Sequence, residues 1–131
     1  MAVGVKTMNE ILVQIGSGIA IALGVVHFAS TKPALRDFKE LAFDSHRMLL
    51  AIWNGIGFMV IHLGAVPLAL TLLGAYTGTC ATVVGLSAVI LSGTLAVSDL
   101  VAHWPTKLPM GKVAPVIFAA IAILIGLGTF L

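Results

Sequence analysis

Charged side chains are scarce in this sequence: they make up 9% of its 131 residues, whereas 60% are hydrophobic. Soluble domains carry about 25% charged residues, and a small one has a large surface to cover with polar groups. This composition therefore fits a lipid environment. The seven basic residues are scattered over loops and form no continuous basic face, so the formal charge of +2 does not indicate a nucleic-acid partner.

Cysteine is also nearly absent. The single thiol, Cys80, excludes an internal disulfide and a multi-cysteine metal site. The sequence contains no P-loop and no nucleophile motif, which argues against ATP-driven chemistry and against Ser or Cys hydrolases.

Long apolar runs are what the chain does have. Four segments reach the length of about 20 residues that a membrane-spanning helix needs, at 11–29, 48–73, 80–101 and 114–131. Backbone in hydrocarbon must satisfy its own hydrogen bonds, so these runs are expected to be helices. The first run exceeds the roughly 7–15 residues of a signal-peptide core and is expected to remain as a permanent span. The sequence predicts an all-α fold: a single transmembrane domain over 1–131, built as a compact antiparallel four-helix bundle.

Basic residues are distributed unequally between the loops. Six of the seven follow the first or third span: Lys32, Arg36, Lys39, Arg47, Lys107 and Lys112. Only Lys6 lies on the other side. The positive-inside rule then predicts cytoplasmic loops at 30–47 and 102–113, with both termini outside, in a bacterial inner membrane.

The first loop has helical periodicity of its own. Leu35, Phe38, Leu41 and Ala42 recur at helical spacing, with charged residues between them. This pattern predicts a short amphipathic helix at the membrane surface, and an ordinary polar loop is the alternative.

Small residues recur on the faces of two spans. Gly16, Ala20 and Gly24 are four apart, and the third span carries a set of glycines and hydroxyl residues: Gly85, Ser87, Ser92, Gly93, Thr94 and Ser98. Helices in lipid associate through such small residues, so these faces are expected to be helix–helix contacts.

Four polar residues gather near the predicted cytoplasmic interface: His27, His46, Asp99 and His103. Asp99 and His103 are four apart and share a helix face, so the carboxylate can orient the imidazole as an acid–base pair. His27, Asp99 and His103, with His46, also form a possible nitrogen–oxygen ligand set for zinc, iron or copper. The alternative is that Asp99 and His103 only cap the helix and meet water or lipid headgroups.

His62 is placed deeper, past the midplane toward the outside, on one helix face with Asn54 and Phe58. His62, Asn54 and His27 are candidate cofactor-binding residues. A haem on His62 needs a second axial ligand at the same depth, and His27 and His103 lie too close to the other surface. The alternative is a hydrogen bond from His62 to Ser17 or Gln14 of the first span.

Three segments resemble one family. "IGSGIAIALGVVHF" (15–28), "WNGIGFMVIHLG" (53–64) and "HWPTKLPMGKVAP" (103–115) are similar to segments of small DoxX-like four-helix membrane proteins. The resemblance implies a four-helix membrane fold, and some DoxX relatives are subunits of quinone-linked oxidoreductases.

Three functions remain open. The first is an accessory or anchor subunit of a membrane complex, with other subunits or copies of itself as partners. The second is a membrane enzyme for a lipophilic substrate, with Asp99 and His103 as catalytic residues. The third is a small transporter or channel that works as an oligomer.

Overall fold

The structure, a computed structural model, describes residues 8–36, 42–103 and 109–131, and of these the side chains of His103 and residues 109–111 are not described. It contains helices α1 (Met8–Ala29), α2 (Thr31–Arg36), α3 (Phe43–Leu72), α4 (Gly78–His103) and α5 (Pro109–Phe130). The predicted all-α fold is confirmed. Four of the helices are long and apolar enough to cross a bilayer, which indicates an integral membrane protein.

All four long helices begin earlier than the hydrophobic runs indicate, and α3 and α5 do so by five residues each. The second span was predicted to begin at 48, but α3 begins at Phe43 and includes Asp44 and Arg47. Charged residues are tolerated there because this end of the helix can project beyond the hydrocarbon. In the same way, α5 begins at Pro109, so Pro115 lies inside the helix.

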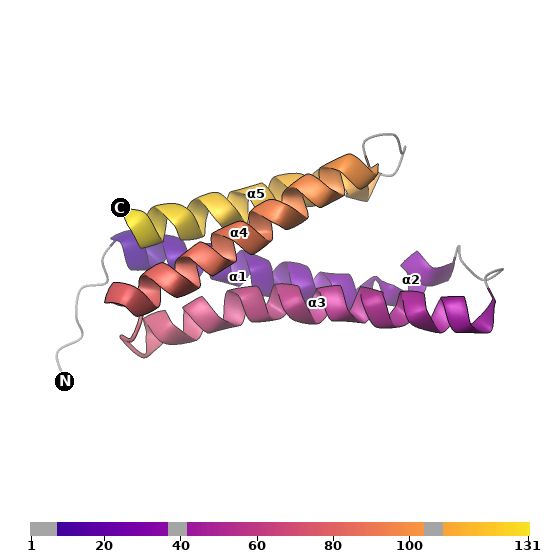
Figure 1. The fold of residues 1–131 in the computed structure, drawn as a ribbon, viewed down its shortest axis with the longest axis horizontal. Coiled ribbons are helices and arrows are strands. Elements are labelled where there is room, and N and C mark those ends of the chain that lie inside the picture. Colours follow the sequence, from indigo (N-terminus) through magenta and orange to yellow (C-terminus); the bar gives the residue numbers. More distant parts are fainter. Residues whose placement is uncertain (1–7, 37–41, 104–108) are drawn as a thin grey trace.

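The four long helices run alternately up and down (Figure 1). The beginning of α1 and the end of α5 lie at one end of the molecule, and α2 and the beginning of α3 lie at the other. α1 packs against both α3 and α5, and α4 packs against α5. α3 and α4 make far fewer contacts, and the α4–α5 pair diverges from the α1–α3 pair toward the 104–108 end. The predicted bundle is therefore antiparallel but open on one side.

Glycines explain which sides of the bundle close. A Cβ on Gly24 would lie 2.9 Å from the backbone nitrogen of Ile61 in α3, and one on Gly16 would lie 2.9 Å from Ile125 Cγ1 in α5. Gly85 similarly admits the side chain of Thr129 at the α4–α5 contact. Missing side chains let these backbones approach closely. The facing surfaces of α3 and α4 carry larger side chains, such as Met59 and Leu91.

The predicted small-residue contacts are confirmed in part. Gly16, Ala20 and Gly24 of α1 are buried, as are Gly85 and Ser92 of α4. By contrast, nothing lies within 4 Å of a Cβ built on Gly93, and three hydroxyl residues of α4 are exposed: Ser87, Thr94 and Ser98. The apolar core joins all four long helices: Ala20, Val60, Leu63, Ala88, Phe118, Ile121 and Ile125.

The helix expected in the first loop is present over Thr31–Arg36. Leu35 is buried, and α2 contacts α3. Of the other residues in its predicted apolar face, Phe38 and Leu41 lie outside the described residues.

Candidate functional site

Two hydrogen bonds join the last turns of α1 to the middle of α3. The indole nitrogen of Trp53 donates to the backbone carbonyl of His27 over 3.2 Å. In return, Nε2 of His27 lies 3.0 Å from the backbone carbonyl of Trp53. The two rings stack, with centroids 4.3 Å apart and an interplanar angle of 16°. Gly57 leaves the space for this pair, because a Cβ there would lie 3.2 Å from His27 Cδ2.

This contact determines which nitrogen of His27 can react. A carbonyl oxygen only accepts hydrogen bonds, so Nε2 must carry a hydrogen and donate it to Trp53. In an uncharged ring the other nitrogen, Nδ1, then has the free lone pair. Any metal or proton bound by His27 must therefore be taken up at Nδ1.

Asp99, the acid of the predicted pair, is half-buried on α4. His46 lies in the first turn of α3. His103 is the last residue of α4, and its side chain lies outside the described part of the chain. Among the described side chains, no three of His, Cys, Asp or Glu are grouped to hold a metal ion. The metal set that includes His103 stays a prediction.

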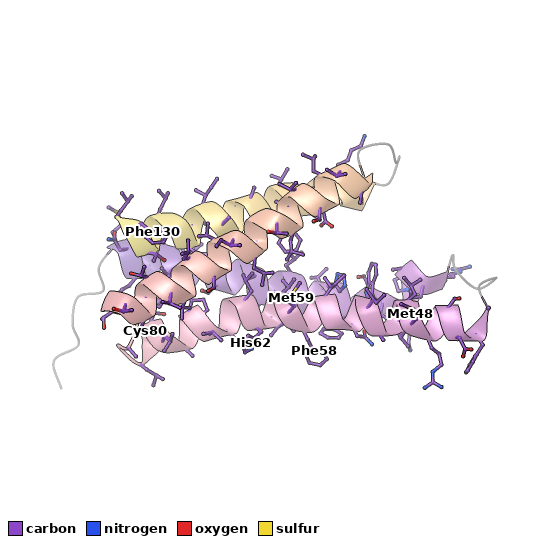
Figure 2. The ribbon with its side chains drawn as sticks, in the orientation of Figure 1. Met48, Phe58, Met59, His62, Cys80 and Phe130 are labelled. Carbon is purple, nitrogen blue, oxygen red and sulfur yellow. The ribbon has the colours of Figure 1, made fainter. Side chains whose placement is uncertain are left out.

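His62 and Asn54 are separate from this cluster. Asn54 is half-buried beside Trp53, whereas His62 is exposed. Figure 2 shows Met59 on the side of α3 toward α4, and His62 and Phe58 at the lower edge of α3 in that view. No described residue hydrogen-bonds the His62 ring. The expected hydrogen bond to Ser17 is wrong, because Ser17 packs beside Gly64 and its buried hydroxyl has no partner.

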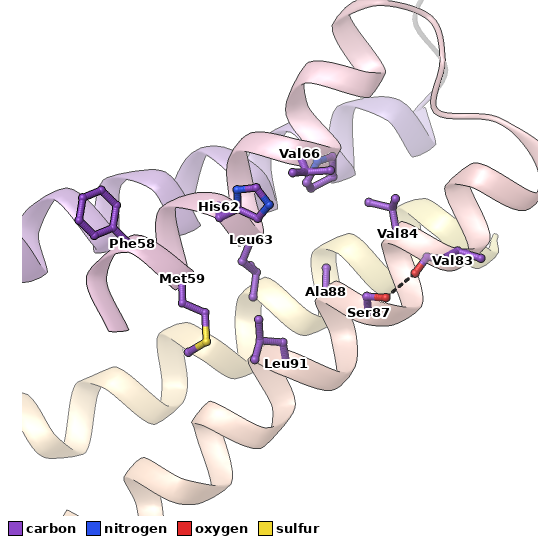
Figure 3. Close-up of a pocket in the computed structure, with 11 residues that line it drawn as sticks. Phe58, Met59, His62, Leu63, Val66, Val83, Val84, Ser87, Ala88 and Leu91 are labelled. Carbon is purple, nitrogen blue, oxygen red and sulfur yellow. Dashed lines mark hydrogen bonds between the residues drawn. The ribbon is translucent and has the colours of Figure 1, made fainter. Parts of the chain in front are cut away.

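A groove of about 540 Å³ lies between α3 and α4, where the bundle is open (Figure 3). It is lined almost entirely by apolar side chains, and its polar groups are His62 on α3 and Ser87 on α4. The Ser87 hydroxyl donates to the carbonyl of Val83 over 2.7 Å. His62 is therefore the polar group of the groove whose hydrogen bonds are not already made within the described residues.

The exposed face of α4 carries a row of small side chains that we call the α4 stripe: Cys80, Ser87, Thr94 and Ser98. Their spacings of seven, seven and four place them on one helix face. The Thr94 hydroxyl donates to the carbonyl of Ile90 over 2.8 Å, as Ser87 does to Val83. α4 is the least buried of the four long helices.

A second polar contact lies at the opposite end of the bundle. The hydroxyl of Tyr76, in the loop between α3 and α4, is 2.6 Å from Oγ1 of Thr129. Thr129 donates its own hydrogen to the carbonyl of Ile125, so the Tyr76 hydroxyl is the donor. Burial raises the pKa of the Tyr76 phenol, and this hydrogen bond opposes the effect.

Sequence reasoning missed Trp53 and Tyr76 as structural partners. The sequence did contain a signal for Trp53. Trp53 and His27 lie at similar distances along their spans from the basic loops. Pairing polar groups on consecutive spans by depth would have matched the two. No comparable signal marks Tyr76, because Thr129 is 53 residues away.

Comparison of the chain with protein-family models, with curated proteins and with solved structures gives no match. The fold and composition support a small four-helix membrane protein.

Proposed function

We propose that this protein is an accessory or anchor subunit of a larger membrane complex. The observation that carries the proposal is the α4 stripe, which faces out of the bundle. Helix association in lipid depends on small side chains that let backbones approach. The buried glycines of this chain serve that purpose inside the bundle, and the α4 stripe offers the same kind of surface to a helix of another chain.

The hydrogen bonds of the stripe are consistent with this role. Ser87 and Thr94 each donate to a carbonyl one turn earlier in α4. Their hydroxyls are thus satisfied before any partner binds, so the stripe is tolerated in lipid while the subunit is free. Close packing, rather than new hydrogen bonds, then drives the association.

Orientation is part of the proposal. The described basic residues Lys32, Arg36, Arg47 and Lys112 are in or beside α2, the start of α3 and the start of α5, at one end of the bundle. This supports a cytoplasmic location for that end, in a bacterial inner membrane.

Cys80 provides a direct test, since it is the chain's single cysteine and belongs to the stripe. A maleimide–benzophenone reagent is attached to Cys80 in native membranes. The membranes are then illuminated, and the cross-linked adducts of this chain are identified by mass spectrometry. We expect a defined adduct with another membrane protein. Thr94→Leu should reduce its yield, whereas Thr82→Leu, a matched change on another exposed face of α4, should not. A protein that yields lipid adducts alone and purifies as a lone stable species contradicts the subunit function.

An enzyme acting on a lipophilic substrate is the second candidate. It is favoured by the tautomer of His27: Nε2 donates to the Trp53 carbonyl, so Nδ1 is the nitrogen that is left to accept a proton. In this proposal Asp99 and His103 act as the acid–base pair. Asp99→Asn should then abolish turnover of the identified substrate and leave unfolding in detergent unchanged, and full turnover by this variant would exclude it.

A further inference from the structure

The contact between α1 and α3 sets how deep one end of the bundle lies in a membrane. α1 spans 22 residues, or about 33 Å, which matches the roughly 30 Å of hydrocarbon in a bilayer. Its last residue, Ala29, therefore lies at the boundary of the hydrocarbon. His27 and Trp53 hydrogen-bond each other, so both lie at one level, about 3 Å inside this boundary.

Basic residues of α3 and α2 lie just outside the boundary. Arg47 is six residues before Trp53 in α3, or about 9 Å, which places it about 6 Å outside the hydrocarbon. Lys32 follows Ala29 by three residues, and the chain stays nearly helical across this step. Lys32 therefore lies within about 5 Å of the boundary.

A third basic residue, Lys112, reaches the same level on α5. This helix runs antiparallel to α1, and Ile125 packs on Gly16. Thirteen residues separate Lys112 from Ile125, and thirteen separate Gly16 from Ala29, so Lys112 lies about level with Ala29. We call these three residues the basic collar: Lys32, Arg47 and Lys112.

The basic collar lies at the depth of lipid phosphates, and its charges are not neutralised within the described chain. The interfacial layer that holds the phosphates extends about 5–8 Å beyond the hydrocarbon on each side. All three side chains are exposed, and none forms an ion pair with a described residue. Arg47 lies over the ring of Phe43, with its guanidinium carbon 5.5 Å from the ring centroid. This contact uses the face of the guanidinium and leaves its N–H groups available to a phosphate.

The arrangement of the basic collar indicates what kind of anion it binds. Its residues come from three helices and share a depth rather than a face, so a rigid polyanion such as nucleic acid does not reach all of them together. Lipid phosphates are separate, mobile anions that lie at one depth, as the collar does. Met48, beside Arg47, is 66% exposed, and an apolar side chain exposed next to a cation fits the edge of a bilayer.

We propose that the basic collar binds the phosphates of anionic phospholipids, such as phosphatidylglycerol, in preference to zwitterionic ones. Arg47 binds a phosphate through paired N–H groups, whereas Lys32 and Lys112 act as single charges. In phosphatidylcholine the choline ammonium offsets the charge of the phosphate, so binding gains less. This lipid site lies on α2, α3 and α5, away from the α4 stripe, and it does not rest on the subunit function.

The test measures how brominated lipids quench the fluorescence of Trp53, which lies near the carboxyl ends of the acyl chains. Trp104→Phe leaves Trp53 as the single tryptophan of the full-length protein. This variant is reconstituted in mixtures of phosphatidylglycerol and phosphatidylcholine, in which one lipid or the other carries bromine at that depth. At about 0.1 M salt we expect phosphatidylglycerol to bind about three- to tenfold more tightly, since one basic side chain near an anionic surface contributes about fivefold. At about 1 M salt the two lipids should bind equally.

Charge substitutions locate the site. Glutamine at all three positions of the basic collar should remove the preference, whereas Arg47→Lys should keep most of it. Asp44→Asn and Glu10→Gln each raise the net charge by one, but Asp44 is three residues from Arg47, and Glu10 is in the first turn of α1, at the opposite end of the bundle. Asp44→Asn should therefore strengthen the preference, and Glu10→Gln should leave it unchanged.

Equal binding of the two lipids at the lower salt concentration would overturn the proposal. A preference that survives high salt, or the glutamine substitutions, would do the same. An effect of Glu10→Gln as large as that of Asp44→Asn would show that net charge, rather than the basic collar, selects the lipid. Native mass spectrometry of the unsubstituted protein in detergent repeats the comparison in case a variant fails to fold, and equal retention of both lipids there is also a refutation. A failed Cys80 cross-link would count against the subunit function without affecting these measurements.

Discussion

Substituting Gly24 by alanine tests whether close backbone contact holds α1 to α3. The new Cβ would lie 2.9 Å from the backbone nitrogen of Ile61 and 3.0 Å from the carbonyl oxygen of Gly57. Both atoms belong to the backbone of α3, so no side-chain rotation relieves the contact. The two helices would have to separate by a few tenths of an ångström or more at this point.

The cost follows from two contributions. Overpacking a close-packed contact with one extra methyl group costs about 1–3 kcal/mol. Separation of the helices also weakens the two hydrogen bonds between His27 and Trp53, each worth about 0.6 kcal/mol in a membrane protein. We expect Gly24→Ala to lower the free energy of unfolding by about 2–4 kcal/mol.

The measurement is reversible unfolding by sodium dodecyl sulfate in mixed micelles, followed by circular dichroism. Two alanine substitutions in the same helix pair are matched controls, because nothing lies within 4 Å of a Cβ built on Gly18 or Gly55. Gly18→Ala and Gly55→Ala should leave stability unchanged or raise it slightly, since alanine favours a helix. Equal stability of Gly24→Ala and its controls would refute the role assigned to the α1–α3 contact.

Two further predictions concern the polar contacts of the bundle. Trp53→Phe removes the indole donor and should cost about 0.6 kcal/mol of unfolding free energy. Combined with His27→Leu, it should cost less than the sum of the single changes, because either change alone already removes the stacking of the two rings; strict additivity would argue against that stacking. Because burial raises the pKa of Tyr76, its contribution to stability is present below pH of about 10 and is lost as pH rises through the higher folded value. As the chain's only tyrosine, Tyr76 can be titrated by ultraviolet absorbance, and Tyr76→Phe should remove the alkaline loss; ionisation at or below pH 10 in the folded protein would contradict this.

The hydrophobic pattern was sufficient to predict four spanning helices and the short helix between the first two. Boundaries were less well predicted, because a helix can continue past the hydrocarbon into polar residues, as α3 does at Asp44 and Arg47. Periodicity also identified Gly16, Gly24 and Gly85 as contact residues. It did not distinguish these buried glycines from the exposed residues Ser87, Thr94 and Ser98. A small residue permits close helix packing, but it does not show whether another helix lies against it.

The sequence identified candidate site residues, but it did not predict which of their side chains contact one another. Depth along the spans placed His27 and Asp99 at the same end of the bundle, and the structure has them near the ends of α1 and α4 that lie there. Depth gave no rotation angle for the helix, and so Ser17 was wrongly expected to partner His62. The pairing of His27 with Trp53 depends on both depth and rotation.

Composition and hydrophobic length by themselves determined that this chain is a helical membrane protein, because only helices hide their backbone polar groups within one segment of sequence. Tertiary packing decided which helix faces meet. Glycines bring α1 close to α3 and α5, and larger side chains keep α3 apart from α4. Those choices depend on contacts between residues far apart in sequence, and they leave a groove open between α3 and α4.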